Sequence, residues 1–272
     1  MQIKVLPLIP ANVKPAPTED FGFGNKFTNR MFTQKWDKES GWHDAQIRPY
    51  ANFSLPPATA VFHYAQEIFE GTKAYRRADG HINLFRPWEN MKRFNRSAVR
   101  MSMPSVDEED HLAAIVQLVT LEKEWVPSVP GASLYIRPAM IATEAALGVH
   151  ASETYLHFII AGPVGAYFKE GFNPIPVYIS EKHRRAVRGG VGAAKTGGNY
   201  AASLFVSDHA AAQGYSQVLW LDAVNGRYVE EVGAMNICFV YEGQQIVTPP
   251  LSDSILDGVT RDSVLKLAPD MG

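Results

Sequence analysis

One lysine stands in a stretch made largely of small residues. Residues 188–200 contain Lys195, five glycines and two alanines. Small residues let a backbone or a ligand approach closely. A lysine that has no neighbouring carboxylate in such surroundings is a candidate for a lowered pKa, because burial disfavours the charged ammonium. A neutral lysine amine is a nucleophile that forms Schiff bases with carbonyl compounds. We therefore expect Lys195 to carry an aldehyde cofactor.

Three other interpretations compete for this stretch. A phosphate loop has two glycines five residues apart, followed by Lys and Ser or Thr; residues 189–196 have that spacing, but Ala194 replaces the second glycine. The Lys195-Thr-Gly triplet is similar to the lysine motif of serine β-lactamases, but the Ser-x-x-Lys from Ser263 to Lys266 follows it, in the wrong order. Composition alone favours a glycine-rich surface loop with a solvated lysine, because most lysines are exposed.

Composition excludes several classes of protein. The chain has 272 residues, 46% of them hydrophobic, and a formal net charge of −2, which does not suggest a nucleic-acid or membrane-surface partner. No apolar run approaches the roughly 18 residues of a membrane helix, and prolines interrupt residues 1–10, so we expect no signal peptide and a cytoplasmic location. The single cysteine, Cys238, excludes an intrachain disulfide and is predicted to be a packing residue in a buried strand over residues 236–241.

The elements before the lysine predict an α+β arrangement. Residues 73–77 and 81–85 form a predicted β-hairpin with Asp79-Gly80 at its turn. Pro87 suits the first turn of a helix. An apolar stripe at helical spacing follows it: Met91, Phe94, Ala98 and Met101.

A second helix is predicted after a capping box that runs from Ser105 to Glu108. Its apolar face is predicted to consist of Leu112, Ile115, Val116 and Val119. Residues 132–137 and 154–160 are mostly apolar and predict buried strands.

The elements around and after the lysine predict a second domain. A helix is expected over residues 199–213, with Gly214 at its C-terminus. Predicted strands cover 175–180, 217–221, 235–241 and 245–248, and a last helix begins at Thr260. We therefore predict a two-domain α/β (α+β) fold. It has a smaller N-terminal α/β domain at 1–165, a linker at 166–177, and a larger cofactor-binding domain with a mixed β-sheet at 178–272.

Several motifs, in their order along the chain, resemble those of the branched-chain amino acid aminotransferases, pyridoxal-phosphate enzymes of fold type IV. Around and after the lysine they are Lys195-Thr-Gly-Gly-Asn-Tyr200, Glu231-Val-Gly-Ala-Met-Asn236 and Leu256-Asp-Gly-Val-Thr-Arg-Asp262. Upstream they are Phe69-Glu-Gly-Thr-Lys-Ala-Tyr75, Leu84-Phe-Arg-Pro-Trp-Glu-Asn-Met-Lys-Arg93 and Ser133-Leu-Tyr-Ile-Arg-Pro138. The resemblance runs from about Phe21 onward.

The resemblance implies the residues that bind pyridoxal 5'-phosphate. Lys195 is the Schiff-base lysine and, once released, a general base. Tyr200 hydrogen-bonds the phenolic oxygen of the cofactor, and Glu231 pairs with its pyridine nitrogen. The phosphate is bound by Val259 and Thr260 at a helix N-terminus and by Arg93, for which a solvated helix position is the alternative. Glu230 would point the other way from Glu231 if the segment is extended.

The resemblance also implies the substrate pocket and a partner. The pocket is lined by Phe23, Tyr64, Tyr135, Tyr167 and Arg137, and Ala234 stands where many relatives carry a hydroxyl residue. A loop that includes Leu147 and Val149 reaches the pocket of a neighbouring subunit, which implies at least a homodimer. No metal is expected.

The implied reaction is transamination between leucine, isoleucine or valine and 2-oxoglutarate. Family members continue beyond residue 272, through a second phosphate-contacting loop, so the chain is expected to lack the family's C-terminal part. The alternatives are another fold type IV enzyme (a D-amino-acid or (R)-amine transaminase, or aminodeoxychorismate lyase) or an inactive fragment.

Overall fold

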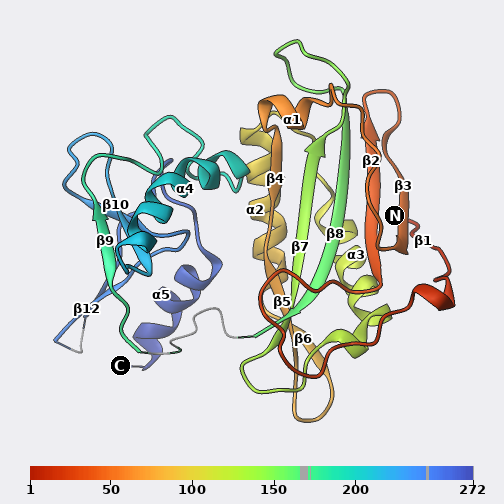
Figure 1. Ribbon diagram of the computed structural model, residues 1–272, viewed down its shortest axis with the longest axis horizontal. Coiled ribbons are helices and arrows are strands. Elements are labelled where there is room, and N and C mark those ends of the chain that lie inside the picture. The colour runs from red at the N-terminus through yellow and green to blue at the C-terminus, as the bar shows by residue number, and fades with distance from the viewer. Residues whose placement is uncertain (166–170, 172, 243–244, 272) are drawn as a thin grey trace. The chain divides into compact units, whose positions relative to one another are not determined.

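The chain divides into two compact units, Met1–Gly171 and Phe172–Gly272. The structure, a computed structural model, describes residues 1–165, 171, 173–242 and 245–271 (Figure 1). Residues 166–170 and 172 of the predicted linker at 166–177 lie outside the described residues, and the predicted domain boundaries stay a prediction. Each unit is described by itself.

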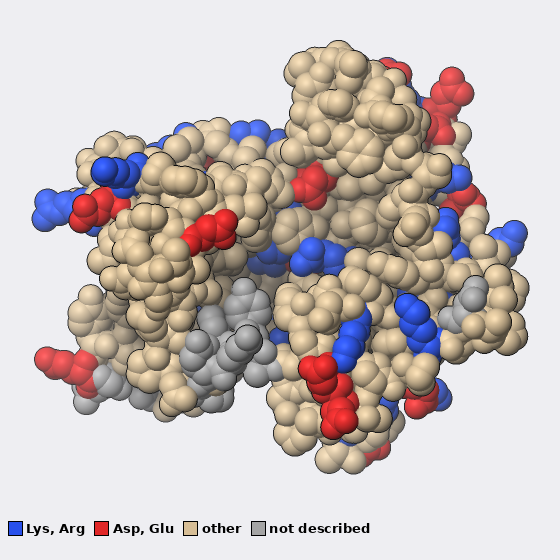
Figure 2. All heavy atoms as spheres, in the orientation of Figure 1, with Lys and Arg blue, Asp and Glu red and all other residues tan. Residues whose placement is uncertain are grey.

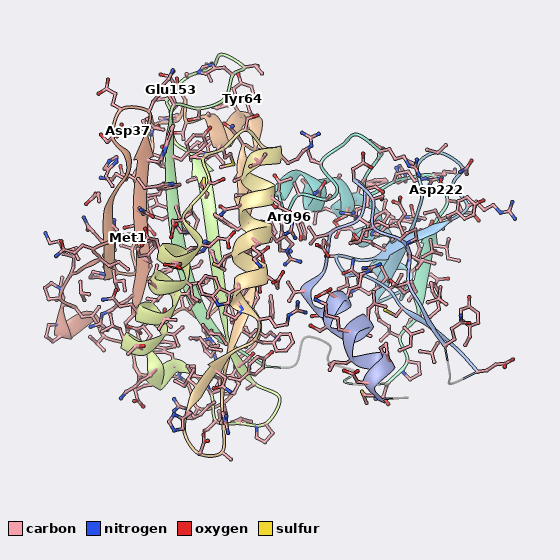
Figure 3. The ribbon with its side chains drawn as sticks, turned by 180° about the vertical axis from the view of Figure 1, so that it is seen from behind. Met1, Asp37, Tyr64, Arg96, Glu153 and Asp222 are labelled. Atoms are coloured by element: carbon pink, nitrogen blue, oxygen red, sulfur yellow. The ribbon has the colours of Figure 1, made fainter. Side chains whose placement is uncertain are left out.

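An eight-stranded sheet organises the first unit. Its strand order is β1-β3-β2-β8-β7-β5-β6, with β4 paired to β7, and every pairing is antiparallel except that of β1 with β3. Figure 1 shows helices α2 and α3 behind the sheet, and the opposite view in Figure 3 shows them in front of it. The elements are β1 (Lys4–Val5), η1 (Pro10–Asn12), β2 (Arg30–Asp37), β3 (Gly41–Pro49), α1 (Ala60–Tyr64), β4 (Glu67–Phe69), β5 (Thr72–Arg76), β6 (Ile82–Leu84), α2 (Pro87–Arg100), α3 (Glu108–Leu121), η2 (Lys123–Trp125), β7 (Ser133–Ala142) and β8 (Thr154–Val164).

The predicted hairpin and first helix are confirmed. Strands β5 and β6 pair antiparallel, and Gly80 in their turn has φ +83°, a conformation that favours glycine. Helix α2 has Pro87 at its N-terminus. Its predicted stripe faces the core, because Met91, Phe94 and Ala98 are fully buried.

The predicted capping box is wrong. Helix α3 begins at Glu108, and the side chain of Asp107, not that of Ser105, caps it by accepting a hydrogen bond from the N–H of Asp110 at 3.0 Å. Val106 cannot belong to the helix because Asn95 holds its backbone: Asn95 Oδ1 accepts from the Val106 N–H at 2.9 Å, and Asn95 Nδ2 donates to the Val106 carbonyl at 2.8 Å. The motif therefore predicts the cap two residues too early.

The buried face of α3 also differs from the predicted one. Val116, expected in the core, is 47% exposed. The buried residues are His111, Ala114, Ile115, Leu118 and Val119. The buried face of α3 therefore includes a polar residue, His111, which the apolar periodicity does not predict.

Two buried histidines lie between α3 and the sheet. The rings of His111 and His157 are 4.6 Å apart between centroids and form an edge-to-face pair. Phe94 packs against both rings. Burial lowers the pKa of both imidazoles, that of His157 to about 3. Both are therefore neutral at pH 7.

The second unit contains two small sheets and two helices among its described residues. Strand β10 is central in the order β11-β10-β9, parallel to β9 and antiparallel to β11. Helix α4 packs on β10 through Val206, Ala210, Val218 and Trp220. The elements are β9 (Val177–Ser180), α4 (Gly197–Ala212), β10 (Gln217–Leu221), β11 (Val229–Val232), β12 (Phe239–Tyr241), β13 (Gln245–Val247) and α5 (Val259–Met271).

Cys238 corrects one prediction. It is exposed, because the strand expected over residues 236–241 begins only at Phe239 and pairs with β13 alone among the described strands. The predicted packing role is therefore wrong.

No helix in the described part of the chain is long and apolar enough to cross a membrane. On the face shown in Figure 2, acidic and basic side chains are scattered among other residues, without a broad patch of one charge.

Candidate functional site

The lysine and the tyrosine of the motif contact each other. Lys195 Nζ donates a hydrogen bond to Tyr200 Oη at 2.8 Å. Lys195 precedes Thr196, the extended N-cap residue of α4, and Tyr200 lies in the first turn of that helix. The five-residue spacing therefore brings an amine and a phenol together at the start of α4. The solvated-lysine alternative does not describe this geometry, because Lys195 is half-buried.

Two residues fix the loop that carries the lysine. The amide of Asn199, which is buried, donates to the carbonyls of Val191 and Ala194 at 2.9 Å each. A Cβ at Gly192 would lie 2.6 Å from the Ser254 carbonyl oxygen, so only glycine fits against that backbone. The glycine-rich composition therefore serves close packing at Gly192 rather than flexibility.

Glu231 is the buried carboxylate of the second unit. It is 3% exposed. Its Oε1 accepts from Asn236 Nδ2 and from the Leu256 N–H, each at 3.1 Å. Its Oε2 lies 2.8 Å from Arg185 Nε, whose N–H is not aligned with that oxygen, so this is a charge contact rather than a hydrogen bond.

Burial dominates the ionisation of Glu231. It raises the pKa to about 7, while the nearby charge of Arg185 and the N–H of Leu256 oppose this rise. A carboxyl group with this pKa holds and shares a proton near neutral pH. It therefore suits a partnership with a basic ring nitrogen.

Glu230 and Glu231 face different surroundings, as the extended segment predicts. Glu231 lines a small cavity of about 20 Å³, whereas Glu230 lines a separate, more open hollow and accepts from Ser254 Oγ at 2.6 Å. Strand β11 alternates its side chains between the two faces of the sheet. The small cavity beside Glu231 is lined by Arg185, Gly192, Ala194, Asn199, Tyr200, Ser203, Glu231, Gly233, Ala234 and Leu256.

The predicted phosphate turn, residues 258–260, lies next to the hydrogen bonds of Glu231. Val259 is the first residue of α5, and Thr260 is the second. Leu256, which donates to Glu231, lies three residues before the helix. A helix N-terminus offers N–H groups and a favourable dipole to an anion. The described residues therefore place an amine, a phenol, a carboxyl group of raised pKa and a helix N-terminus in one unit, and this donor set fits pyridoxal phosphate.

Arg93 is not a solvated helix residue. It is 7% exposed and lies in the first unit, on α2. Its Nε and Nη2 donate to the two oxygens of Glu70 at 2.6 and 2.9 Å. Glu70 is fully buried and also accepts from Asn90 Nδ2 at 2.9 Å. Glu70 therefore fixes the plane of the Arg93 guanidinium.

Three of the predicted pocket residues line one cavity of the first unit. Phe23, Tyr135 and Arg137 line a cavity of about 160 Å³. Arg137 Nη2 donates to Tyr135 Oη at 2.9 Å, and its guanidinium lies 4.5 Å from the centre of the Phe69 ring. The cavity thus combines aromatic walls with a cation held in place by a hydroxyl group.

The remaining predicted residues lie elsewhere or are not described. Tyr64 Oη donates to the carbonyl of Leu147, and Figure 3 shows Tyr64 at the same end of the sheet as Glu153. Val149 is 86% exposed. Tyr167 lies outside the described residues. Among the described residues, no group of three or more His, Cys, Asp or Glu side chains could hold a metal ion.

Sequence reasoning gave no role to four residues that build these networks: Glu70, Arg185, Asn199 and Asn236. Three of them, Glu70, Asn199 and Asn236, lie inside the quoted motifs. Arg185 lies in a polar run before the loop. For the other three residues, their position in a motif was the one indication of a role, but the motif does not reveal which residues they contact in the fold.

Comparison with known proteins agrees with this geometry. The family model described as amino-transferase class IV matches residues 67–272. The chain is 54% identical over 260 residues to branched-chain-amino-acid transaminase 1 of Bacillus subtilis (strain 168), covering 95% of this chain and 72% of the relative. It is also 54% identical to a probable branched-chain-amino-acid aminotransferase of Streptomyces coelicolor, covering 92% of this chain and 69% of the relative.

Solved structures show the same fold. The branched-chain amino acid aminotransferase of Escherichia coli has a TM-score of 0.72 and 29% identity, covering 88% of this chain and 75% of that one. The T.th. branched-chain amino acid aminotransferase with pyridoxamine 5'-phosphate has a TM-score of 0.70 and 28% identity, covering 88% of this chain and 74% of that one. The chain therefore belongs to the class IV aminotransferases, a family of pyridoxal-phosphate-dependent enzymes, and within it to the branched-chain-amino-acid transaminases. The predicted fold class, enzyme class and cofactor are thereby confirmed.

Proposed function

We propose that this protein transfers the amino group of leucine, isoleucine or valine to 2-oxoglutarate, giving the branched-chain 2-oxo acid and glutamate. The observation that carries the proposal is the cluster of Lys195, Tyr200 and Glu231 in one unit, with Lys195 Nζ donating a hydrogen bond to Tyr200 Oη and Glu231 buried at the cavity wall. The names of the relatives support the branched-chain substrates.

The predicted site residues of the second unit each have a proposed task. Lys195 binds the aldehyde carbon of the cofactor and, when released, moves the α-proton of the substrate. Tyr200 forms a hydrogen bond with the phenolic oxygen of the cofactor. Glu231 keeps a proton on the pyridine nitrogen, and Val259 and Thr260 bind the phosphate. Pyridoxal phosphate, when bound, supplies the aldehyde that accepts the amino group and the ring that withdraws electrons.

Residues of the first unit have proposed tasks as well. Arg93 contributes positive charge to the phosphate, oriented by Glu70. Phe23, Tyr135 and Arg137 bind the substrate side chain, together with Tyr64 and Tyr167. Aromatic walls suit an aliphatic side chain, and Arg137 suits the second carboxylate of glutamate. Ala234 offers the substrate carboxylate its backbone N–H only.

A homodimer in the cytoplasm completes the proposal. Leu147 and Val149 are 63% and 86% exposed, and Phe62 on α1 is 61% exposed. Exposed apolar side chains of this size mark interaction surfaces when they gather. Light scattering coupled to size exclusion tests this part, and a monomer at micromolar concentration would contradict it.

The test of function is a substrate comparison. The protein, supplied with pyridoxal phosphate, is given L-leucine or D-alanine with 2-oxoglutarate, and glutamate is measured by chirally resolved chromatography. The proposal predicts L-glutamate from L-leucine and none from D-alanine. Turnover of D-alanine alone would assign the protein to another fold type IV activity. Binding of cofactor without turnover of either amino acid would contradict the proposed reaction but not the cofactor site.

A further inference from the structure

Asn236 lies between two segments to which the proposed function gives separate tasks. Its Nδ2 donates to Glu231 Oε1 at 3.1 Å and to the Leu256 carbonyl at 2.9 Å. The Leu256 N–H donates to the same Glu231 oxygen at 3.1 Å. One amide therefore closes a ring of hydrogen bonds between the carboxylate on β11 and the segment that leads into α5.

The other end of the same amide packs on the phosphate turn. A Cβ at Gly258 would lie 1.9 Å from Asn236 Oδ1, so the amide rests directly on the Gly258 backbone. Gly258 immediately precedes Val259, and its carbonyl accepts the Asp262 N–H at 2.9 Å, which closes the first turn of α5. A shift of the Asn236 side chain must therefore move the start of α5 or be blocked by it.

The position of the carboxylate depends on this amide. Glu231 is buried, and a buried carboxylate oxygen that loses a donor carries the cost of desolvation without compensation. Without Asn236, both the Glu231 oxygen and the Leu256 carbonyl lose a partner. Among the described residues, the direct hydrogen bond from the Leu256 N–H to Glu231 then still joins the two segments.

We propose that Asn236 is a positioning residue that couples the carboxylate for the ring nitrogen to the helix N-terminus for the phosphate. Its amide sets the separation of these two anchors, so that one ligand molecule satisfies both at once. This inference rests on the proposed function, because it takes from it the tasks of Glu231, Val259 and Thr260. Asn236 acts through these residues and has no proposed contact with the reacting atoms.

Coupling predicts a specific pattern of ligand affinities. Pyridoxal phosphate uses both anchors, whereas pyridoxal lacks the phosphate and uses only the ring anchor. Dissociation constants of both ligands are measured by absorbance titration of the full chain freed of cofactor. Glu231→Gln is expected to weaken both ligands by a similar factor, which leaves their ratio unchanged. Thr260→Ala is expected to weaken pyridoxal phosphate alone.

Asn236→Ala is expected to combine the two effects. It weakens pyridoxal by about tenfold, as the loss of one hydrogen bond to a buried charged group does. It weakens pyridoxal phosphate by on the order of a hundredfold, because the second anchor is displaced as well. An unchanged ratio would show that Asn236 acts through Glu231 only, and unchanged pyridoxal affinity would show that it acts on the turn only. Either result overturns the coupling.

Asn95→Ala is the matched control. Asn95 also bridges a backbone carbonyl and a backbone N–H, those of Val106, but in the first unit. This control is expected to lower stability and to leave both affinities unchanged. If Asn236→Ala behaves in the same way, its role is structural and the proposal is overturned.

Gly258→Ala tests the same contact from the other side and covers the case in which Asn236→Ala does not fold. The added Cβ collides with Asn236 Oδ1, so we expect the Asn236→Ala pattern. In the double variant the shortened residue 236 makes room for the new methyl group, so both affinities should be no lower than in either single variant. Additive losses in the double variant would overturn the proposal. A wild-type protein that binds neither ligand would refute the proposed function instead.

Discussion

The buried pair of Glu70 and Arg93 yields a stability prediction. Glu70 is fully buried, and its two oxygens accept four hydrogen bonds, from Arg93 Nε (2.6 Å), Arg93 Nη2 (2.9 Å), Asn90 Nδ2 (2.9 Å) and the Gly71 N–H (3.0 Å). Glu70→Gln keeps the shape of the side chain but removes its charge. It also turns one acceptor into an NH₂ group that faces donors.

The magnitude follows from the burial of both partners. Arg93 is left as a buried cation without its carboxylate, and removing one partner of a buried ion pair costs about 3–5 kcal/mol. That is a large share of a total stability of about 5–15 kcal/mol. We therefore expect a clear fall in the urea midpoint with an unchanged slope.

The assay is equilibrium urea unfolding followed by circular dichroism. The matched control is Glu153→Gln, because Glu153 pairs with Lys38 at 2.9 Å while both side chains are mostly exposed. This control should not shift the midpoint measurably. A loss below about 1 kcal/mol for Glu70→Gln, the range typical of an exposed pair, would contradict the large contribution of this buried pair to stability.

Three further predictions concern other residues. His157 has a pKa of about 3 in the folded protein against 6.5 for the free group. The unfolded state therefore binds more protons than the folded state between these pH values, and the free energy of unfolding falls as the pH drops below 6.5. In acid-unfolding curves, His157→Leu should reduce this fall by about 3 kcal/mol at pH 4. An equally steep curve for the variant would contradict this prediction. Gly192→Ala places a Cβ 2.7 Å from Ser254 Cα and should cost about 1–3 kcal/mol in thermal unfolding. Gly198→Ala, which meets nothing within 4 Å in α4, should be neutral or stabilising; equal losses would refute the packing argument. Arg185→Met removes the cation beside Glu231, so the pKa of Glu231 should rise further above about 7 in carboxyl-resolved NMR titrations; an unchanged or lower pKa would contradict this.

Local patterns predicted the local structure well. Asp79-Gly80 indicated the hairpin, and the stripe after Pro87 indicated the buried face of α2, because turn chemistry and helical periodicity are properties of neighbouring residues. The cap of α3 was misplaced because Asn95, from a different helix, binds the backbone of Val106. A contact between distant segments overrode a motif that was locally acceptable.

In the site, too, local patterns predicted local features but not the contacts between distant segments. The motif around Glu231 and the alternation along β11 separated this residue from Glu230, and both face the surroundings expected of them. Arg185 and Asn236 received no role, because their partners lie up to 46 residues away in sequence and only the fold brings them together. The apolar neighbours of Cys238 predict a position in the core, but they do not reveal where the strand begins.

The proposed function requires that Lys195 binds pyridoxal phosphate for the transamination of branched-chain amino acids. It is tested most directly by the visible absorption spectrum of the wild-type protein and of Lys195→Ala, each incubated with pyridoxal phosphate and dialysed, before and after addition of L-leucine. We predict a yellow wild-type protein whose visible band fades with L-leucine, and a variant without that band. A wild-type protein that stays colourless, or a variant that shows the same band and the same response to L-leucine, would contradict it.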